Sequence, residues 1–262
     1  MFPKLIRICL LVFILAGCRT TRLSYPDDQN FRMAEASFLK GEYQIAIDNY
    51  ILFISGQPLS VYVSEAYYRT GISYLAMDNV KEALPYLKES LNRAKYTDLR
   101  TQVLNSLGFL YFVQQNYAEA IKHYELALKG NKAILPIAEV YYNTGVSFMR
   151  TNHWREGRKY IQLAKDAAGK NERIISESAT ERLSLPPDTF VVQLGKFDNK
   201  DNAQAYQSEV LSEKGLKVTV NIILIEGNEF FYLWAGSFPT YQEAVARAEE
   251  IRECGLEAVV MP

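Results

Sequence analysis

Apolar residues recur at three- and four-residue intervals along most of the chain, and this spacing changes near the carboxyl end. Leu104, Leu107 and Tyr111, for example, stand on one face of a predicted helix. Pro186 and Pro187 end this pattern, because a helix cannot continue through two prolines. From residue 189 on, apolar and polar residues alternate as in strands. The pattern predicts an all-α part at residues 27–184, a linker at 185–188 and a small α+β domain at 189–262.

Small residues recur every 37 residues in the helical part, at Ala34, Gly71, Gly108 and Gly145. A second set stands twelve residues after the first, at Ala46, Ala83, Ala120 and Gly157. Two helices approach closely where a small residue lies at their contact, so each unit predicts a helical hairpin. One hairpin cannot bury its apolar face alone, so the units are expected to stack into a superhelix.

The third unit carries the residues of a known repeat family. Its small and aromatic positions resemble the tetratricopeptide repeat, in the pattern Gly108, Tyr111, Ala120, Tyr124 and Ala127. The resemblance covers about residues 27–170, with a period of 37 in place of the family's usual 34, and residues 170–184 predict a helix that caps the array. It implies a groove that holds a protein partner and is lined by Tyr68, Arg69, Asn105, Tyr142 and Asn143. For each of these residues, a place in the core or on plain surface stays open.

The carboxyl-terminal part predicts six elements in the order βαββαβ. The strands are expected at 190–197, 217–225, 229–238 and 257–261, and the helices at 202–214 and 240–253. This order predicts an antiparallel sheet with two helices on one face and a free face for a ligand. Strand alternation places Val192, Leu194, Leu233 and Ala235 beneath the helices. The same alternation places Val191, Gln193, Tyr232 and Trp234 on the free face.

Two segments of this part, residues 192–197 and 233–238, align position for position. Their sequences and spacing resemble the SPOR domain, a family that binds cell-wall glycan strands lacking stem peptides. The resemblance implies a glycan across the sheet, where an indole stacks on a sugar ring and an amide bonds to hydroxyl and acetamido groups. The candidate contacts are Gln193, Trp234, Tyr232, Val191, Lys196 and Ser237. Core packing for Trp234, a solvated strand position for Gln193, and turn chemistry for Lys196 and Ser237 are the alternatives.

The first 17 residues have the pattern of a secretory leader, with basic residues before an apolar run too short to span a membrane. Residues 15–18 resemble a bacterial lipobox, which implies a signal peptide at 1–17, a lipid on Cys18 and a tether at 18–26. An ordinary cleaved signal with an incidental cysteine is the alternative. Arg19 stands where an aspartate favours inner-membrane retention, so we expect the periplasmic face of the outer membrane.

Charge argues against a nucleic-acid partner for the terminal domain. RNA-recognition modules also use βαββαβ sheets with exposed aromatics. Residues 188–262, however, contain 12 acidic and 6 basic side chains, a net charge of -6. Such a surface repels a phosphate backbone, whereas a neutral glycan is indifferent to it.

Catalytic chemistry is not expected. The two histidines, His123 and His153, have no partners at metal-ligand spacing, and the sequence contains no phosphate-binding loop. After loss of the leader and lipidation of Cys18, Cys254 is the one thiol left, so no disulfide framework can form, and we expect it to be a small buried hydrophobe. No cofactor is predicted apart from the lipid on Cys18.

Together these features predict a non-catalytic, lipid-anchored envelope protein. It is expected to bind stripped glycan strands through residues 189–262 and an unidentified envelope protein through its repeats, in cell division or wall remodelling. The alternative is a pure protein scaffold whose terminal domain does not bind glycan. A sheet face plugged by the neighbouring repeats or by the chain's own tail would contradict glycan recognition and leave only a tethered protein scaffold.

Overall fold

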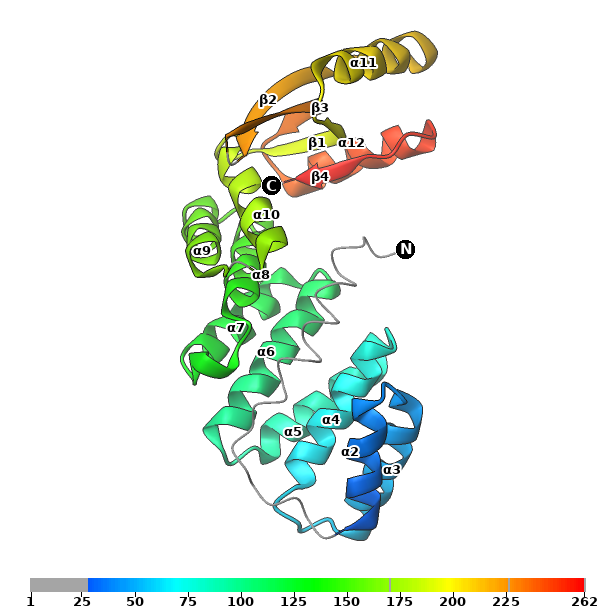
Figure 1. Cartoon of the computed structure of the whole chain (residues 1–262), viewed down its shortest axis with the longest axis vertical. Coiled ribbons are helices and arrows are strands. Elements are labelled where there is room, and N and C mark those ends of the chain that lie inside the picture. Colours follow the sequence, from blue (N-terminus) through cyan, green and yellow to red (C-terminus); the bar gives the residue numbers. More distant parts are fainter. Residues whose placement is uncertain (1–27, 170, 226, 262) are drawn as a thin grey trace. The chain divides into compact units, whose positions relative to one another are not determined.

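The protein is represented by a computed structural model that describes residues 28–169, 171–225 and 227–261 (Figure 1). The predicted signal peptide, Cys18 and the tether lie outside the described residues. The chain forms two compact units that divide between Val140 and Tyr141, inside helix α8 (Ile137–Arg150). The boundary therefore does not coincide with the linker at 185–188, and the last helices of the array belong to the same unit as the sheet.

Helical hairpins make up the first unit, as the 37-residue repeat predicts. Helix α2 (Gln29–Leu39) pairs with α3 (Tyr43–Gly56), α4 (Val63–Ala76) with α5 (Val80–Arg93), and α6 (Thr97–Val113) with α7 (Tyr117–Leu128). A short 3₁₀ turn (Lys132–Ile134) follows. In the second unit, the end of α8 faces α9 (Trp154–Ala167), and helix α10 (Arg173–Ser184) packs on α9.

The recurring small residues lie where the two helices of a hairpin touch. A Cβ atom on Gly108 would stand 2.6 Å from Cδ1 of Tyr124, and one on Gly71 would stand 2.7 Å from Leu87. Gly145 has the same relation to Ile161, at 2.9 Å. Each glycine of a first helix thus leaves the space that a large side chain of the second helix fills, which confirms the close approach predicted from the repeat.

The turns inside the hairpins keep the same 37-residue register. The second residue after each first helix has positive φ: Gly41, Asp78, Gln115 and Asn152. The amide of the next residue donates a hydrogen bond to the carbonyl five positions earlier, from Glu42 to Ser37, Asn79 to Tyr74, Asn116 to Tyr111 and His153 to Phe148. This left-handed helix end favours glycine, yet glycine stands at only one of the four positions. Residue type alone therefore hides this part of the repeat.

The sheet of the second unit has the strand order β2-β3-β1-β4, and all its pairs are antiparallel. Its strands are β1 (Phe190–Phe197), β2 (Thr219–Ile225), β3 (Asn228–Phe238) and β4 (Val259–Met261). Helices α11 (Lys200–Lys214) and α12 (Tyr241–Glu253) complete the predicted βαββαβ order. Helix α11 begins two residues before its predicted start, because the Asn199 side chain caps it by accepting from the amides of Asp201 and Asn202.

One face of the sheet packs on α11 and α12. Val192, Leu194, Leu233 and Ala235 are buried there in one apolar cluster, as strand alternation predicts. Trp154 of α9 packs against the same cluster, and its ring centroid lies 4.6 Å from that of Phe190. The Arg150 guanidinium donates to the carbonyl of Val260 and lies 3.9 Å from the Tyr241 ring centroid. The last hairpin is thus fastened to the domain that follows it.

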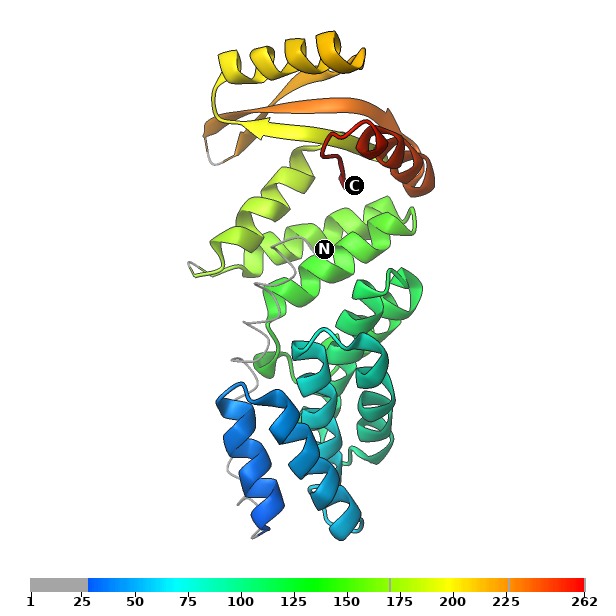
Figure 2. The ribbon, with the colours of Figure 1, turned by 90° about the vertical axis from the view of Figure 1, so that its right-hand side faces the viewer.

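The opposite face of the sheet is not free. Helix α10 and the residue after it lie against this face, on the side away from α11 (Figures 1 and 2). Leu185 is buried in a small cluster with Val191, Tyr232 and the Ile223 and Ile225 side chains of β2. The prediction of an uncovered face is therefore wrong, because the helix expected only to cap the repeats also packs on the sheet.

The close approach of hairpin helices predicts a sharp difference between two glycines. Replacement of Gly108 by Val should lower the free energy of unfolding by about 1–3 kcal/mol, because the added carbons collide with Tyr124. Gly56, near the end of α3, has no atom within 4 Å of its Cβ position, so Gly56→Ala should be neutral or slightly stabilising. Urea denaturation followed by circular dichroism measures both, and equal effects would contradict the packing described.

Candidate functional site

A row of four side chains crosses the sheet on the face away from α11 and α12. In strand order they are Thr219, Trp234, Gln193 and Val259, and each is registered against its neighbour. Directly paired residues of antiparallel strands share a face, so these side chains lie side by side. All four are at least partly exposed, and Val259 is 54% exposed. The structure thus brings the two main predicted residues, Gln193 and Trp234, into contact range at the centre of the row.

Irregular pairing of β1 shapes this face. The register between β1 and β3 shifts on both sides of Gln193, as at a β-bulge. Lys196 is consequently paired with Tyr232 and shares its face, whereas strict alternation from Gln193 would turn Lys196 to the helices. The Lys196 ammonium lies 4.5 Å from the ring centroid of Phe230 and 5.4 Å from that of Tyr232. The shift therefore places a cation beside the aromatic residues of the row.

Two predicted contact residues are on the expected face but are fully covered. Val191 and Tyr232 are both 0% exposed, beneath Leu185 and the end of α10. Glu181 of α10 reaches over the same area, with a carboxylate oxygen 3.8 Å from the Lys196 ammonium. The prediction that Val191 and Tyr232 are accessible is therefore wrong, since packing from outside the domain covers them. Ser237, registered against Val191, is exposed.

Polar atoms on this face are buried without partners among the described residues. They are the Gln193 amide oxygen and the Trp234 indole nitrogen. A buried polar group without a hydrogen bond costs about 1–3 kcal/mol, so two on one face are a notable departure from normal packing. Burial, and after it the negative charge of Glu181 and a hydrogen bond to its carboxylate, raise the pKa of Tyr232 above its ordinary value. The Tyr232 hydroxyl accordingly keeps its proton and donates a hydrogen bond to Glu181 in this arrangement.

The aligned segments of β1 and β3 share one local feature. A Cβ atom at Gly195 would stand 2.7 Å from the ring of Phe197, and one at Gly236 would stand 2.8 Å from the ring of Phe238. In both segments the glycine leaves space for the aromatic ring two residues later. This contact explains why the glycine and the aromatic residue occupy matching positions in the aligned segments 192–197 and 233–238.

The predicted groove residues of the repeats are mostly buried. Tyr68, Arg69, Asn105 and Asn143 are each less than 9% exposed, so the core alternative describes them better than an open groove does. Burial raises the pKa of Tyr68 to about 12. Tyr142 is half-buried, and its hydroxyl accepts a hydrogen bond from Nε of Arg182 at 2.6 Å. In this arrangement, none of the five presents a free polar side chain to a peptide.

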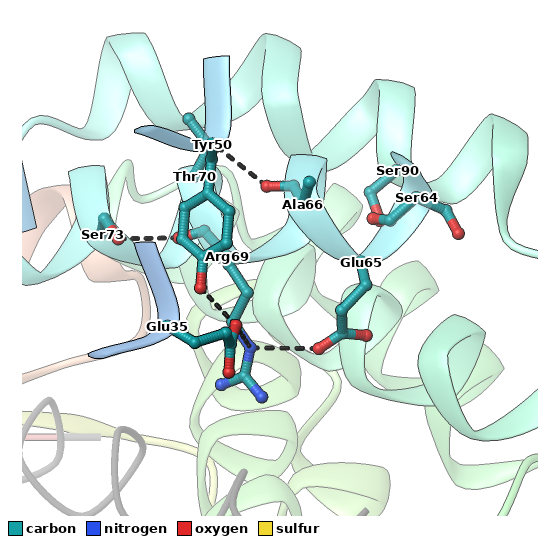
Figure 3. Close-up of polar contacts among 9 residues, drawn as sticks. All are labelled: Glu35, Tyr50, Ser64, Glu65, Ala66, Arg69, Thr70, Ser73 and Ser90. Atoms are coloured by element: carbon teal, nitrogen blue, oxygen red, sulfur yellow. Dashed lines mark hydrogen bonds and ion pairs between the residues drawn. The ribbon is translucent and has the colours of Figure 1, made fainter. Parts of the chain in front are cut away.

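Arg69 belongs to a buried ionic network in the first unit (Figure 3). Its Nε atom lies 3.0 Å from a carboxylate oxygen of Glu65 and 3.5 Å from one of Glu35. The Tyr50 hydroxyl donates to Glu35, and the guanidinium lies over the Phe38 ring. Burial raises the pKa of Glu65 despite the nearby arginine, and the two carboxylates hold the pKa of Arg69 high. The network links α2, α3 and α4, which gives Arg69 a structural role.

The sequence did not reveal which residues contact Arg69 in the repeats, or which residues cover the sheet face of the second unit. The spacing of Glu65 and Arg69 by four residues on one helix was a usable signal for that pair. Nothing local connects Glu35 to Arg69, or Glu181 and Leu185 to the sheet. Cys254 was also predicted wrongly: it is exposed, because it stands in the turn after α12 and not on its buried face.

The described residues contain no group of three or more His, Cys, Asp or Glu side chains that could hold a metal ion. Within the same residues, no helix is both long and apolar enough to cross a membrane.

Comparison with known families gives both parts of the chain an assignment. Residues 186–262 match the model of the SPOR domain, and residues 65–94 and 101–129 match models of the tetratricopeptide repeat. The chain therefore contains tetratricopeptide repeats followed by a SPOR domain. The SPOR family implies peptidoglycan binding, and the repeats imply protein–protein interaction. Both are non-catalytic binding domains.

Solved structures with similarity to this chain include a crystal structure of MamA, which is 21% identical and has a TM-score of 0.44. That match covers 56% of this chain and 79% of the other. A crystal structure of the APC/C hetero-tetramer Cut9-Hcn1 is 19% identical, with a TM-score of 0.41, and covers 58% of this chain and 27% of the other. No curated protein sequence matches the chain.

The buried network predicts that Arg69 is needed for stability. Replacement of Arg69 by Met leaves the buried Glu35 and the half-buried Glu65 carboxylates without their cation and should lower the free energy of unfolding by about 3–5 kcal/mol. Arg93 forms a similar pair with Glu89, but both side chains are well exposed, so Arg93→Met should change stability by less than about 1 kcal/mol. Urea denaturation compares the two, and an unaffected Arg69→Met protein would refute the structural role.

Proposed function

We propose that this protein is a non-catalytic component of the bacterial envelope that binds glycan strands stripped of stem peptides through the sheet face of its SPOR domain. The observation that carries the proposal is the pair of unpartnered polar groups on that face, the indole nitrogen of Trp234 and the amide oxygen of Gln193. They stand on adjoining strands, and Gln193 is registered against Trp234.

The chemistry of this face suits an amino-sugar chain. An indole offers a flat apolar surface to the C–H bonds of a pyranose ring, while its N–H donates a hydrogen bond. The amide of Gln193 both donates and accepts, as hydroxyl and acetamido groups require. Lys196 and Ser237 stand at the edges of the face as further candidate contacts.

We further propose that the repeats bind a protein partner and that the pair acts in cell division or in wall remodelling. Four of the predicted groove residues are buried: Tyr68, Arg69, Asn105 and Asn143. We therefore expect other residues of the repeats to form the surface that binds the partner.

The competing function is a protein scaffold whose SPOR domain does not bind glycan. The coverage of Val191 and Tyr232 by Leu185 and α10 favours it, because a glycan cannot reach those side chains in this arrangement. Trp234 and Gln193 keep partial exposure, which favours glycan binding. A binding measurement separates the two functions.

Sacculi digested with an amidase carry stripped glycan and provide the test. Wild-type protein should bind them, and Trp234→Ala should weaken binding at least about tenfold, because stacking of an aromatic ring contributes about 1–3 kcal/mol. Tyr96→Ala, which removes an exposed aromatic of the repeats, is the matched control and should bind like wild type. Equal retention of wild type and Trp234→Ala would support the scaffold.

We also propose that Cys18 carries a lipid that holds the protein at the periplasmic face of the outer membrane. The lipobox-like residues 15–18 support this proposal, and multiple acyl chains on one residue give firm anchoring. Cells grown with labelled palmitate should label the wild-type protein and the Cys254→Ala variant, but not Cys18→Ala. Label that persists in Cys18→Ala would exclude this anchor.

A further inference from the structure

Helix α10 and the residue after it, Leu185, contact the sheet on this face. Leu185 is buried against Val191 and Tyr232, Glu181 is paired with Lys196 across 3.8 Å, and α10 also packs on β2. The Lys196 side chain is 35% exposed, so water weakens this ion pair. The contact nevertheless occupies the side of the sheet where Trp234 and Gln193 stand.

The polar groups of this contact do not match. On the sheet, the Trp234 indole nitrogen and the Gln193 amide oxygen are buried without partners, as far as the described residues go, whereas the Tyr232 hydroxyl has a hydrogen bond to Glu181. Interfaces that are permanent pair nearly all of their buried polar groups. Unpaired polar groups of this kind are therefore expected on a face that is arranged to bind a ligand other than α10.

Helix α10 is attached on its other side to the last hairpin. The Arg158 guanidinium of α9 donates to the carbonyl of Leu183 at 2.8 Å, and Arg182 donates to the Tyr142 hydroxyl of α8. Adjacent residues of α10 thus reach in different directions: Glu181 to the sheet and Arg182 to the hairpin. This attachment keeps α10 near the sheet face even when its contact with the face is broken.

We propose that α10 and Leu185 form a displaceable lid that competes with glycan for the sheet face of the SPOR domain. In the closed state the lid covers Tyr232 and Val191, and in the open state Tyr232, Trp234 and Gln193 face the ligand together. The proposal rests on the proposed glycan function. Because glycan binds the open state, its apparent affinity falls by the fraction of molecules that are open.

Weakening the lid should therefore tighten glycan binding. Glu181→Gln removes the ion pair with Lys196 and should raise the affinity for amidase-treated sacculi about two- to fivefold. Leu185→Ala removes the buried anchor and should raise it about tenfold or more. The matched control is Glu177→Gln, since Glu177 lies on the same helix but pairs with Arg173 instead of the sheet. Addition of Trp234→Ala to either lid variant should abolish the gain.

A second measurement reports the lid without any glycan. In a Trp154→Phe background Trp234 is the one remaining tryptophan, so its fluorescence reports the sheet face. Acrylamide quenching of Trp234 should rise in Glu181→Gln and Leu185→Ala and stay unchanged in Glu177→Gln. Circular dichroism spectra identical to that of the background protein would establish that each variant is folded.

The outcomes distinguish the lid from the proposed function. Tighter binding together with stronger quenching in the lid variants supports the lid. Equal binding by wild type and both lid variants, above the nonspecific level, overturns the lid and leaves glycan binding in place. If quenching increases in the lid variants but every form is retained on sacculi only at the nonspecific level, glycan binding is overturned. The role of α10 as a competitor of glycan is then overturned with it.

Discussion

Burial of Tyr232 beneath Glu181 and Leu185 is the contact on which the functional account of this protein depends. The Tyr232 side chain lies on the same sheet face as Trp234 and Gln193, so whatever covers Tyr232 limits what can reach its neighbours. The helix that caps the repeats therefore also covers part of the SPOR sheet face. In the proposed lid, this contact sets access to that face.

The second unit combines two contacts of different kinds on opposite faces of the sheet. On the helix side, Trp154 packs against Phe190 within a continuous apolar cluster, which is the packing of a stable core. On the other side, the cluster around Leu185 is small and bordered by polar atoms without partners. The first contact keeps the last hairpin and the domain together. In the proposed lid, the second contact opens while that core stays intact.

Much of the architecture could be predicted from sequence because the signals are local and periodic. Small residues 37 apart predict the hairpin contacts, and alternation in β1 and β3 assigns Val192 and Leu233 to the helix side correctly. The failures involve contacts between residues far apart in the chain. No periodicity connects Leu185 to Tyr232 or Glu35 to Arg69, so the covered face and the buried groove residues were missed. The register shift beside Gln193 likewise depends on pairing between strands, which composition does not reveal.

The most direct test of the central claim is a nuclear magnetic resonance titration of the full chain with stripped glycan fragments. The chain has two tryptophans, so its indole region contains one signal from Trp154 and one from Trp234. The account predicts that glycan shifts the Trp234 indole signal together with the backbone amides of residues 181–185, while the Trp154 indole signal stays in place. A saturating titration that leaves the Trp234 signal unmoved would contradict it.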